Sequence, residues 1–266
     1  MITDLSIIIP VYKAKKTINK AVGSIFRQKY KNKRPRIEII IAVDDQYRYE
    51  NIIKNQSNNI KIKFTSTKKI GSGPGNARNK GILKSNGKYI GFLDADDTYS
   101  ENYIEEMYKN VVANDIVICP THVYQNNMKI VEFLESNKKK FVIEDISRVP
   151  CTFHPFLKRN LIEQYENNAS QDVYNLALLS NKKPINVVKN CFYKLNIWNE
   201  SYTADEKFYH KVEGAYKYYQ IKSINEKKNK IAKQFALRRI LNRKYEHWKI
   251  NNLNKGYYEF IVEYLK

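Results

Sequence analysis

Cysteine is scarce in this sequence, and long apolar runs are missing. The three cysteines, Cys119, Cys151 and Cys191, are far apart, and no CxxC pair occurs. We therefore expect reduced, half-buried thiols rather than a structural zinc site or a disulfide framework. No apolar run approaches the ~20 residues that cross a bilayer as a helix.

The beginning of the sequence also lacks the pattern of a secretory signal. Asp4 precedes the apolar run 5–11, Lys13 follows it, and no small-residue cleavage site is present. We expect a cytoplasmic protein, with peripheral attachment to the inner face of the cell membrane as an open alternative. Internal repeats and flexible linkers are absent too, so the 266 residues suit one large domain, or one domain with an appendage.

Acidic residues are outnumbered by basic ones. The chain has 27 Asp and Glu against 47 Lys and Arg, a formal net charge of +20. Such a chain attracts phosphates, whether of nucleic acid, anionic lipid or a nucleotide-linked substrate. Abundant Lys, Asn, Ile and Tyr would equally follow from an AT-rich genome, so charge alone leaves the function open. The hydrophobic fraction of 42% excludes wholesale disorder.

Short apolar runs alternate with amphipathic segments over the first 120 residues. The pattern predicts buried strands at 5–11, 37–43, 60–65, 88–93 and 115–119, and helices at 15–28, 76–85 and 101–112. This alternation indicates an α/β fold with a mainly parallel sheet flanked by helices. Ligands of such sheets bind at the carboxyl ends of the strands, where Asp44-Asp45 and the acidic segment 94–97 fall.

After residue 119 the pattern changes. Segments 121–125 and 128–133 flank Asn126-Asn127 and predict a hairpin. Helices are predicted at 156–164 and 171–179, a strand at 184–195, and mostly helix over 203–266. We expect residues 1–205 to form the main domain and residues 206–266 a basic helical C-terminal extension.

Two motifs suggest that the ligand carries a diphosphate. Alternate carboxylates in Asp94-Ala-Asp96-Asp97 suit a hard divalent cation that also binds substrate phosphates, unless Asp97 merely caps the next helix. Gly71-Ser-Gly-Pro-Gly75 precedes a helix that contains Arg78, and helix N-termini and arginine both suit phosphate. The glycine segment is neither a Walker A loop nor a dinucleotide fingerprint, and a simple turn remains the alternative.

Together, four motifs resemble family 2 glycosyltransferases with the GT-A fold. They occur in the family's order and spacing over about residues 4–120, with a weaker match to about 205: Leu5–Tyr12, Val43–Asp45, Gly75–Ile82 and Phe92–Asp97. The resemblance implies inverting, hexosyltransferase-type transfer of a sugar from a nucleotide diphosphate, with UDP expected. The acceptor would be a hydroxyl of a saccharide or lipid-linked glycan in bacterial surface polysaccharide synthesis, and the cofactor Mn²⁺ or Mg²⁺.

The resemblance also implies roles on the nucleotide side of the site. Pro10 and Tyr12 would line the nucleotide pocket, and Asp45 would contact the base. The family usually continues Asp-Asp-Gly-Ser-Thr-Asp, whereas this chain has Gln46–Tyr49 after Asp45. This difference makes the identity of the base less certain than the presence of a nucleotide.

Further roles follow for the diphosphate and the metal. Arg78 would lie near the nucleotide or diphosphate, and Asp94 would contact the donor sugar or ribose. Asp96 would bind the metal, with Asp97 as a substitute ligand. Lys194 would contact phosphate, next to the family's Ser-x-Thr segment, here 201–203.

An inverting transferase also needs a carboxylate that takes the proton from the acceptor hydroxyl. In the family this group is the Asp of a Glu-Asp pair that opens a helix, which implies Asp172, with Gln171 in place of Glu. Asp172 would otherwise only favour the helix N-terminus. His154 and Glu166 are the next candidates, although a lone His is more often packed than catalytic.

The tail and two rival functions stay open. Residues 227–250 mix apolar and basic side chains in a helical pattern, which suits either an anionic membrane surface or packing on the core or on a second copy. A sugar-phosphate nucleotidyltransferase would have a glycine-rich loop at 10–13, and this chain does not. A nucleic-acid-binding protein would need a recognisable motif, and we find none.

Overall fold

The β-branched runs of the first half form one side of an eight-stranded sheet. The computed structural model describes residues 3–32, 34–53, 57, 59–134, 137–198 and 208–265. Four parallel strands have the spatial order β3-β2-β1-β4: β1 (Leu5–Val11), β2 (Ile37–Val43), β3 (Ile60–Ser66) and β4 (Tyr89–Phe92). All of β2 and nearly all of β1 are buried, as expected for parallel strands covered on both faces.

Shorter strands complete this sheet, in the order β10-β6-β11-β9 after β4. They are β6 (Ile116–Ile118), β9 (Lys140–Phe141), β10 (Phe156–Lys158) and β11 (Ile185–Val187). The predicted helix at 156–164 is wrong, because β10 lies antiparallel between β4 and β6 and is followed by a 3-10 turn, Arg159–Leu161. Phe156 and Leu157 are buried on opposite faces, and so short an apolar run has no period that distinguishes strand from helix.

A second sheet of four strands lies beside the first, in the order β5-β12-β7-β8. The predicted hairpin is confirmed as β7 (Thr121–Gln125) and β8 (Met128–Phe133). The single strand predicted at 184–195 is wrong, since β11 and β12 (Tyr193–Ile197) belong to different sheets. β5 (Thr98–Tyr99) pairs with β12, so the residues after Asp97 form a strand rather than a capped helix.

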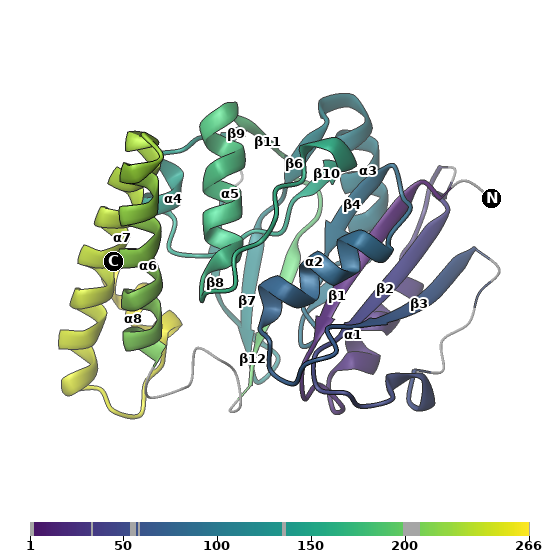
Figure 1. Cartoon of the computed structure of the whole chain (residues 1–266), viewed down its shortest axis with the longest axis horizontal. Helices are drawn as coiled ribbons and strands as arrows, with labels where there is room; N and C mark the ends of the chain where they lie inside the picture. The colour runs from purple at the N-terminus through teal and green to yellow at the C-terminus, as the bar shows by residue number, and fades with distance from the viewer. Residues whose placement is uncertain are drawn as a thin grey trace.

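Helices cover both faces of the large sheet (Figure 1). On one face α2 (Pro74–Lys84) packs so closely that Gly81 leaves no room for a Cβ beside Ile8 of β1. The apolar cluster on the other face joins Ile7 to side chains of α1 (Ile18–Phe26) and α3 (Tyr103–Asn114). The predicted helix at 171–179 is confirmed as α5 (Gln171–Lys182), and a short helix, α4 (Asp145–Arg148), precedes it.

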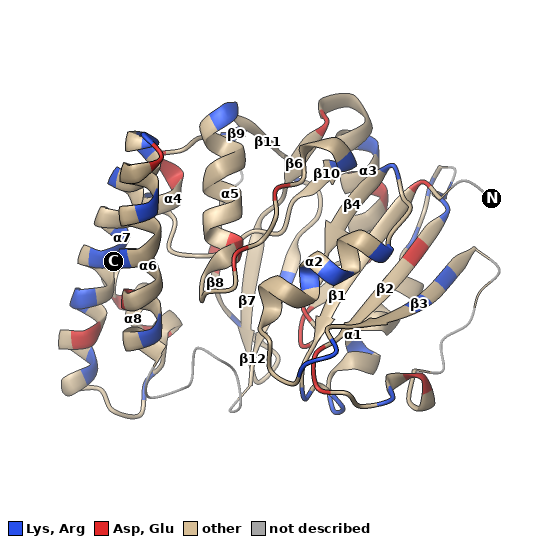
Figure 2. Cartoon of the chain, viewed as in Figure 1, with Lys and Arg blue, Asp and Glu red and all other residues tan. Residues whose placement is uncertain are grey.

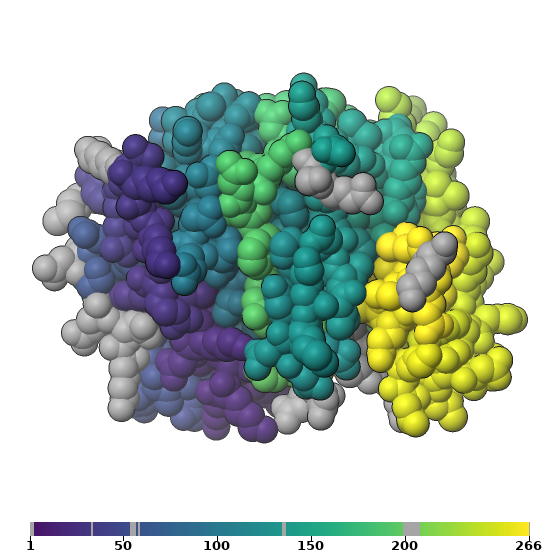
Figure 3. Space-filling model, turned by 180° about the vertical axis from the view of Figure 1, so that it is seen from behind, coloured from purple at the N-terminus to yellow at the C-terminus, as the bar shows by residue number. Residues whose placement is uncertain are grey.

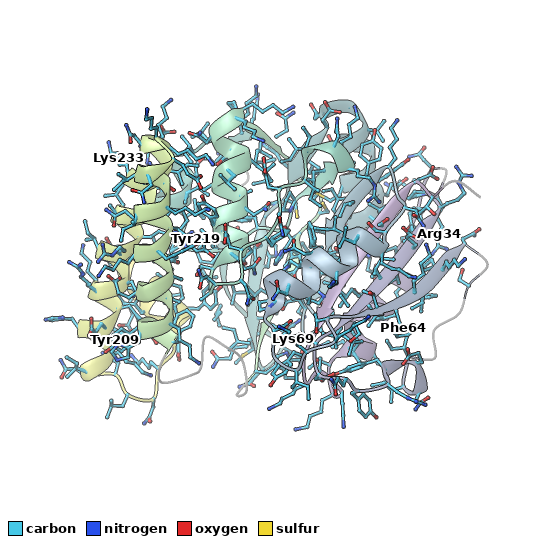
Figure 4. All side chains as sticks on the ribbon, viewed as in Figure 1. Arg34, Phe64, Lys69, Tyr209, Tyr219 and Lys233 are labelled. Carbon is cyan, nitrogen blue, oxygen red and sulfur yellow. The ribbon has the colours of Figure 1, made fainter. Side chains whose placement is uncertain are left out.

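The C-terminal residues are helical, as predicted. They form α6 (Phe208–Asn225), α7 (Asn229–Ile250) and α8 (Tyr257–Tyr264), and the boundary expected at 205/206 lies outside the described residues. Tyr219 of α6 stacks on Tyr174 of α5 with ring centroids 4.4 Å apart, on the side of α6 that faces α5 (Figure 4). From behind, α8 lies against β8 (Figure 3). These helices therefore share one apolar core with the strands.

Two of the absences noted in the sequence can be compared with the fold. Cys119, Cys151 and Cys191 are free thiols, as expected, but each is fully buried. Among the described residues, no helix has the length and apolar character needed to span a bilayer.

Candidate active site

Asp44, at the carboxyl end of β2, holds the glycine-rich loop in place. Its Oδ1 accepts hydrogen bonds from the backbone N–H (3.1 Å) and the hydroxyl (2.5 Å) of Ser72, and its Oδ2 accepts one from the N–H of Gly73 (2.9 Å). Gly73 has φ +100°, in the left-handed region that favours glycine, and opens α2. Asp44 was not among the predicted site residues, although it lies at a strand end next to Asp45, which was predicted to contact the base.

Asp45 connects the ends of β1 and β2. Its carboxylate accepts hydrogen bonds from the N–H of Lys13 (2.6 Å), the N–H of Tyr47 (3.1 Å) and the hydroxyl of Tyr49 (2.7 Å). Tyr12 follows β1 and is exposed beside Gly71. Pro10, two residues before Tyr12, lies in β1. The structure thus brings Pro10, Tyr12 and Asp45 to one edge, and their contact with a base stays a prediction.

Asp94 lies between the side chains of Arg78 and His154 at the end of β4. Its Oδ1 accepts a 2.5 Å hydrogen bond from Arg78 of α2, and its Oδ2 lies 3.4 Å from Nε2 of His154. Burial by itself would raise the pKa of the Asp94 carboxyl, but Arg78 and His154 outweigh burial and hold that pKa well below its usual range. Asp94 is therefore an ionised carboxylate that pairs with the buried guanidinium of Arg78.

Asp96 differs from Asp94 because, among the described residues, no Lys or Arg forms an ion pair with it, and the influence of Arg78 and His154 on its pKa is smaller than that of burial. Burial, together with the charge of Asp94, raises the pKa of Asp96 to about 6. Its backbone oxygen accepts hydrogen bonds from Asn196 Nδ2 (3.1 Å) and Trp198 Nε1 (3.3 Å). Within the described part of the chain, no side chain donates a hydrogen bond to the carboxylate of Asp96.

The carboxylate of Asp97 is hydrogen-bonded to other parts of the protein. Its buried carboxylate accepts hydrogen bonds from the hydroxyl of Tyr193 (2.8 Å) and the N–H of Asn196 (2.8 Å), both on β12. Burial and the neighbouring Asp96 and Asp94 raise the pKa of Asp97 well above its usual value. Of the two predicted metal ligands, Asp96 therefore offers its carboxylate oxygens, whereas Asp97 joins the acidic loop to the second sheet.

The free carboxylate of Asp96 fits a divalent cation. Mg²⁺ and Mn²⁺ prefer hard oxygen ligands and often use one or two carboxylates, with substrate phosphates and water as the rest. No group of three or more His, Cys, Asp or Glu surrounds a common metal position in the residues that the structure describes. An ion bound by Asp96 would then depend on the donor for its other ligands.

Asp172 opens α5, and the segment before β10 connects it to Asp94. The hydroxyl of Thr152 donates a 2.6 Å hydrogen bond to Oδ2 of Asp172, and the N–H of Val173 donates one of 2.9 Å to Oδ1. Two residues after Thr152, His154 contacts Asp94. His154 was predicted only as an alternative base, and Thr152 was not predicted to have a role. A lone His or Thr has no local sequence signal that separates a site residue from a packed one.

Buried polar atoms without partners occur around these carboxylates. Among the described residues they include Arg78 Nε and Gln171 Oε1. A buried polar atom without a partner costs about 1–3 kcal/mol, so both atoms favour a polar ligand that completes them. Arg78 lies within electrostatic range of both Asp94 and Asp172, which places these three side chains in one site.

Lys194 is not part of this group. Its Nζ lies 3.9 Å from the centre of the Tyr124 ring, and burial and the charge of Lys20 lower its pKa. The preceding residue, Tyr193, points to Asp94 and Asp97. Because successive side chains of a strand point to opposite faces, Lys194 faces away from Asp94. The Ser-x-Thr segment at 201–203 lies outside the described residues.

Comparison with known proteins identifies the family. Residues 6–168 match the model of glycosyl transferase family 2. The chain belongs to this family. It is 34% identical over 142 residues to an uncharacterized glycosyltransferase of Haemophilus influenzae, covering 52% of each chain. It is 27% identical over 136 residues to the Escherichia coli UDP-Glc:alpha-D-GlcNAc-diphosphoundecaprenol beta-1,3-glucosyltransferase WfgD, covering 50% of this chain and 52% of WfgD.

Another relative is a protein of teichoic acid synthesis. The minor teichoic acid biosynthesis protein GgaA of Bacillus subtilis is 36% identical over 110 residues, which cover 39% of this chain and 24% of GgaA. The family 2 chain described here thus spans about half, or less, of the length of the curated relatives it matches.

Solved structures confirm the predicted fold. Staphylococcus aureus TarS 1-349 superimposes with a TM-score of 0.64 at 16% identity, covering 94% of this chain and 74% of that one. Its complex with UDP-GlcNAc has a TM-score of 0.60 at 15% identity, covering 80% and 66%. Similarity at this level shows the GT-A α/β fold alone.

Proposed function

We propose that this family 2 protein transfers a sugar with inversion from a nucleoside diphosphate, UDP being the expected nucleotide, to a hydroxyl of a saccharide or lipid-linked glycan. The observation that carries the proposal is one site in which Arg78 pairs with Asp94 and lies within electrostatic range of both Asp172 and Asp96. The names of relatives support the substrate class, since WfgD uses UDP-Glc and a diphosphoundecaprenol-linked acceptor and TarS was solved with UDP-GlcNAc.

In the proposed reaction Asp172 accepts the proton of the acceptor hydroxyl. The hydroxyl oxygen bonds to the anomeric carbon, and the bond from that carbon to the diphosphate oxygen breaks, with the electron pair leaving on the diphosphate. Thr152 and the N–H of Val173 hold the two oxygens of Asp172 in a fixed orientation. Arg78, which is positioned by Asp94, would stabilise the leaving group with its positive charge. A Mn²⁺ or Mg²⁺ ion held by Asp96 would supply further positive charge.

The test is a screen of nucleotide sugars for donor hydrolysis with Mn²⁺ present. We expect hydrolysis of at least one UDP-sugar, lost on chelation and reduced at least about 100-fold in Asp96→Asn, a change that keeps shape but removes a ligand charge. Asp115→Asn is the matched control, because Asp115 lies half-exposed after α3 and pairs only loosely with Lys158, at 3.6 Å.

Two results would contradict parts of this proposal. Wild-type turnover that survives full chelation would remove the metal. Failure of every nucleotide sugar to react, with a folded protein, would remove the transferase function itself.

A further inference from the structure

The outer face of α7 exposes a stripe of basic and apolar side chains. Exposed residues recur at spacings of three and four, which places them on one side of a helix. We call this the exposed stripe, and its members are Lys230, Lys233, Leu237, Ile240, Lys244 and His247. It runs for about 26 Å at the helical rise of ~1.5 Å per residue.

The opposite face of α7 is buried in the core. Ile231 and Phe235 are fully buried, and Tyr245 packs against α8 through Tyr257 and Phe260. The alternative of core packing that the sequence left open therefore applies to this inner face only. Because the inner face holds α7 to the protein, the exposed stripe is a rigid surface rather than a loose tail.

The lysines of the exposed stripe have no acidic ion-pair partner among the residues that the structure describes. Glu246 is the one acidic residue in Asn229–Ile250. It is partly buried and is not a member of the exposed stripe. No acidic side chain within the described residues pairs with Lys230 or Lys233, and Figure 4 shows Lys233 on the outer side of α7. Figure 2 shows basic residues repeated along this helix.

Apolar side chains lie in the middle of the same stripe. Leu237 is 41% and Ile240 52% exposed, between Lys233 and Lys244. Exposed leucine and isoleucine flanked by lysine are the features of a helix that lies in a bilayer interface, where apolar groups enter the headgroup boundary and cations meet anionic lipid.

We propose that the exposed stripe of α7 docks on an anionic lipid surface. A second copy of the chain is a poor occupant, because an isologous contact would bring lysine against lysine. A nucleic acid duplex would use the cations but leave Leu237 and Ile240 facing a charged backbone. The inference rests on the proposed function only in that a lipid-linked acceptor would lie in the same membrane.

Vesicle co-sedimentation of the full chain tests the charge of the stripe. We expect binding to phosphatidylcholine vesicles that contain phosphatidylglycerol, and none to phosphatidylcholine alone. Each lysine is worth about fivefold in binding, so K230Q/K233Q/K244Q should weaken it by roughly 100-fold. The control K61Q/K84Q/K109Q changes net charge equally at exposed lysines elsewhere, and should weaken binding by less than about fivefold.

A second pair of variants tests the apolar part. L237S/I240S should lose the binding that survives high salt, because salt screens charge but not apolar burial. L83S/V112S, at exposed apolar residues of α2 and α3, is the matched control and should keep it. Circular dichroism and urea unfolding of each variant show whether the fold is retained.

Several outcomes would overturn the proposal. The first is that the full chain does not bind vesicles, and the second is that both lysine triple variants lose vesicle binding equally. The others are tighter binding to a DNA duplex that L237S/I240S leaves unchanged, and self-association of the chain that L237S/I240S abolishes. Donor hydrolysis without vesicles should be the same in stripe variants and wild type. Lipid binding can therefore fail while transferase activity persists, and the reverse, so the two proposals fail separately.

Discussion

The pKa values of two aspartates in one motif, Asp94 and Asp96, are shifted in opposite directions by their neighbours. Asp94 touches Arg78 and His154, which lower its pKa. For Asp96, two residues later, burial and the like charge of Asp94 outweigh the weaker influence of Arg78 and His154 and raise its pKa to about 6. Identical side chains thus acquire different chemistry from the groups around them. Asp94 positions Arg78, whereas the carboxylate of Asp96 is available to bind a cation.

Replacement of Asp96 should therefore stabilise the protein while removing activity. The usual pKa of 3.8 rises to about 6 on folding, so wild type loses stability as pH rises from about 4 to 6. The full shift corresponds to about 3 kcal/mol, but partial exposure of the side chain reduces our expectation to about 1 kcal/mol. Urea unfolding in chelator should show Asp96→Asn more stable than wild type at pH 7.5, with a smaller difference at pH 4.5. An equal difference at both pH values would contradict this explanation.

Asp172→Asn should abolish transfer and leave donor binding within a few-fold, because the carboxylate acts on the acceptor. Steady-state kinetics with donor and acceptor varied separately measures both effects. Near-normal transfer by Asp172→Asn would assign the base elsewhere, to Glu166 or His154 first.

The orientation of Asp172 can be tested at Thr152. Thr152→Val removes the hydroxyl that orients Asp172 and should lower kcat about tenfold with donor KM unchanged. Thr152→Ser keeps the hydroxyl and should keep most of the activity, and the same kinetics compares the two variants.

At the scale of elements, the start of α2 is packed against the segment before α5. A Cβ on Gly75 would come within 2.0 Å of the backbone oxygen of Glu166. Asn79 exchanges two hydrogen bonds with the backbone of Tyr165, at 2.8 and 2.9 Å. Glu166 in turn pairs with Lys222 of α6 at 3.3 Å. The helix that contains Arg78 is thus held at a set distance from the segment that leads to Asp172.

A matched pair of glycine variants tests this close approach. Gly75→Ala should push α2 from the 162–170 segment, cost about 1–3 kcal/mol and lower donor turnover at least about tenfold. Gly214→Ala, on the exposed side of α6 with nothing within 4 Å of the new Cβ, should stabilise the protein by about 0.5–1 kcal/mol without changing turnover. Urea unfolding and donor hydrolysis are the measurements. Equal effects of the two variants would argue against a close approach at Gly75.

At the scale of the whole molecule, Arg238 of α7 connects the C-terminal helices to the site. Its buried guanidinium donates to the carbonyl oxygens of Ile146 (2.5 Å), Val149 (3.1 Å) and Cys151 (3.0 Å), and to the Tyr216 hydroxyl. The chain continues from Cys151 to Thr152 and His154. Residues far apart in sequence therefore hold the segment that contacts Asp172 and Asp94.

Neighbouring arginines provide the test of this connection. Arg238→Ala leaves several buried acceptors without partners and should cost about 3 kcal/mol or more. Arg239→Ala removes a partly exposed pair with Glu213 and should cost less than about 1 kcal/mol. Urea unfolding compares the two, and we also expect Arg238→Ala to lower donor turnover. Similar costs for both variants would mean that Arg238 holds nothing in place.

Local pattern was enough to predict a large part of this protein. The β-branched runs 5–11 and 37–43 predicted β1 and β2, and residues 121–133 predicted the β7–β8 hairpin, because burial of both faces or a two-residue turn leaves a local trace. The rule that ligands bind at strand carboxyl ends pointed to Asp94 and Asp96 before any contact was known.

Only the tertiary structure decided the rest, since those properties depend on partners distant in sequence. Phe156–Lys158 is a strand because β4 and β6 lie on either side of it, which no period in three residues can show. Asp97 is occupied because β12, about a hundred residues away, supplies Tyr193 and Asn196. The lowered pKa of Asp94 likewise needs both Arg78 and His154 in place. Sequence specifies such groups by type, but their pKa and role arise from burial and charge that folding alone brings together.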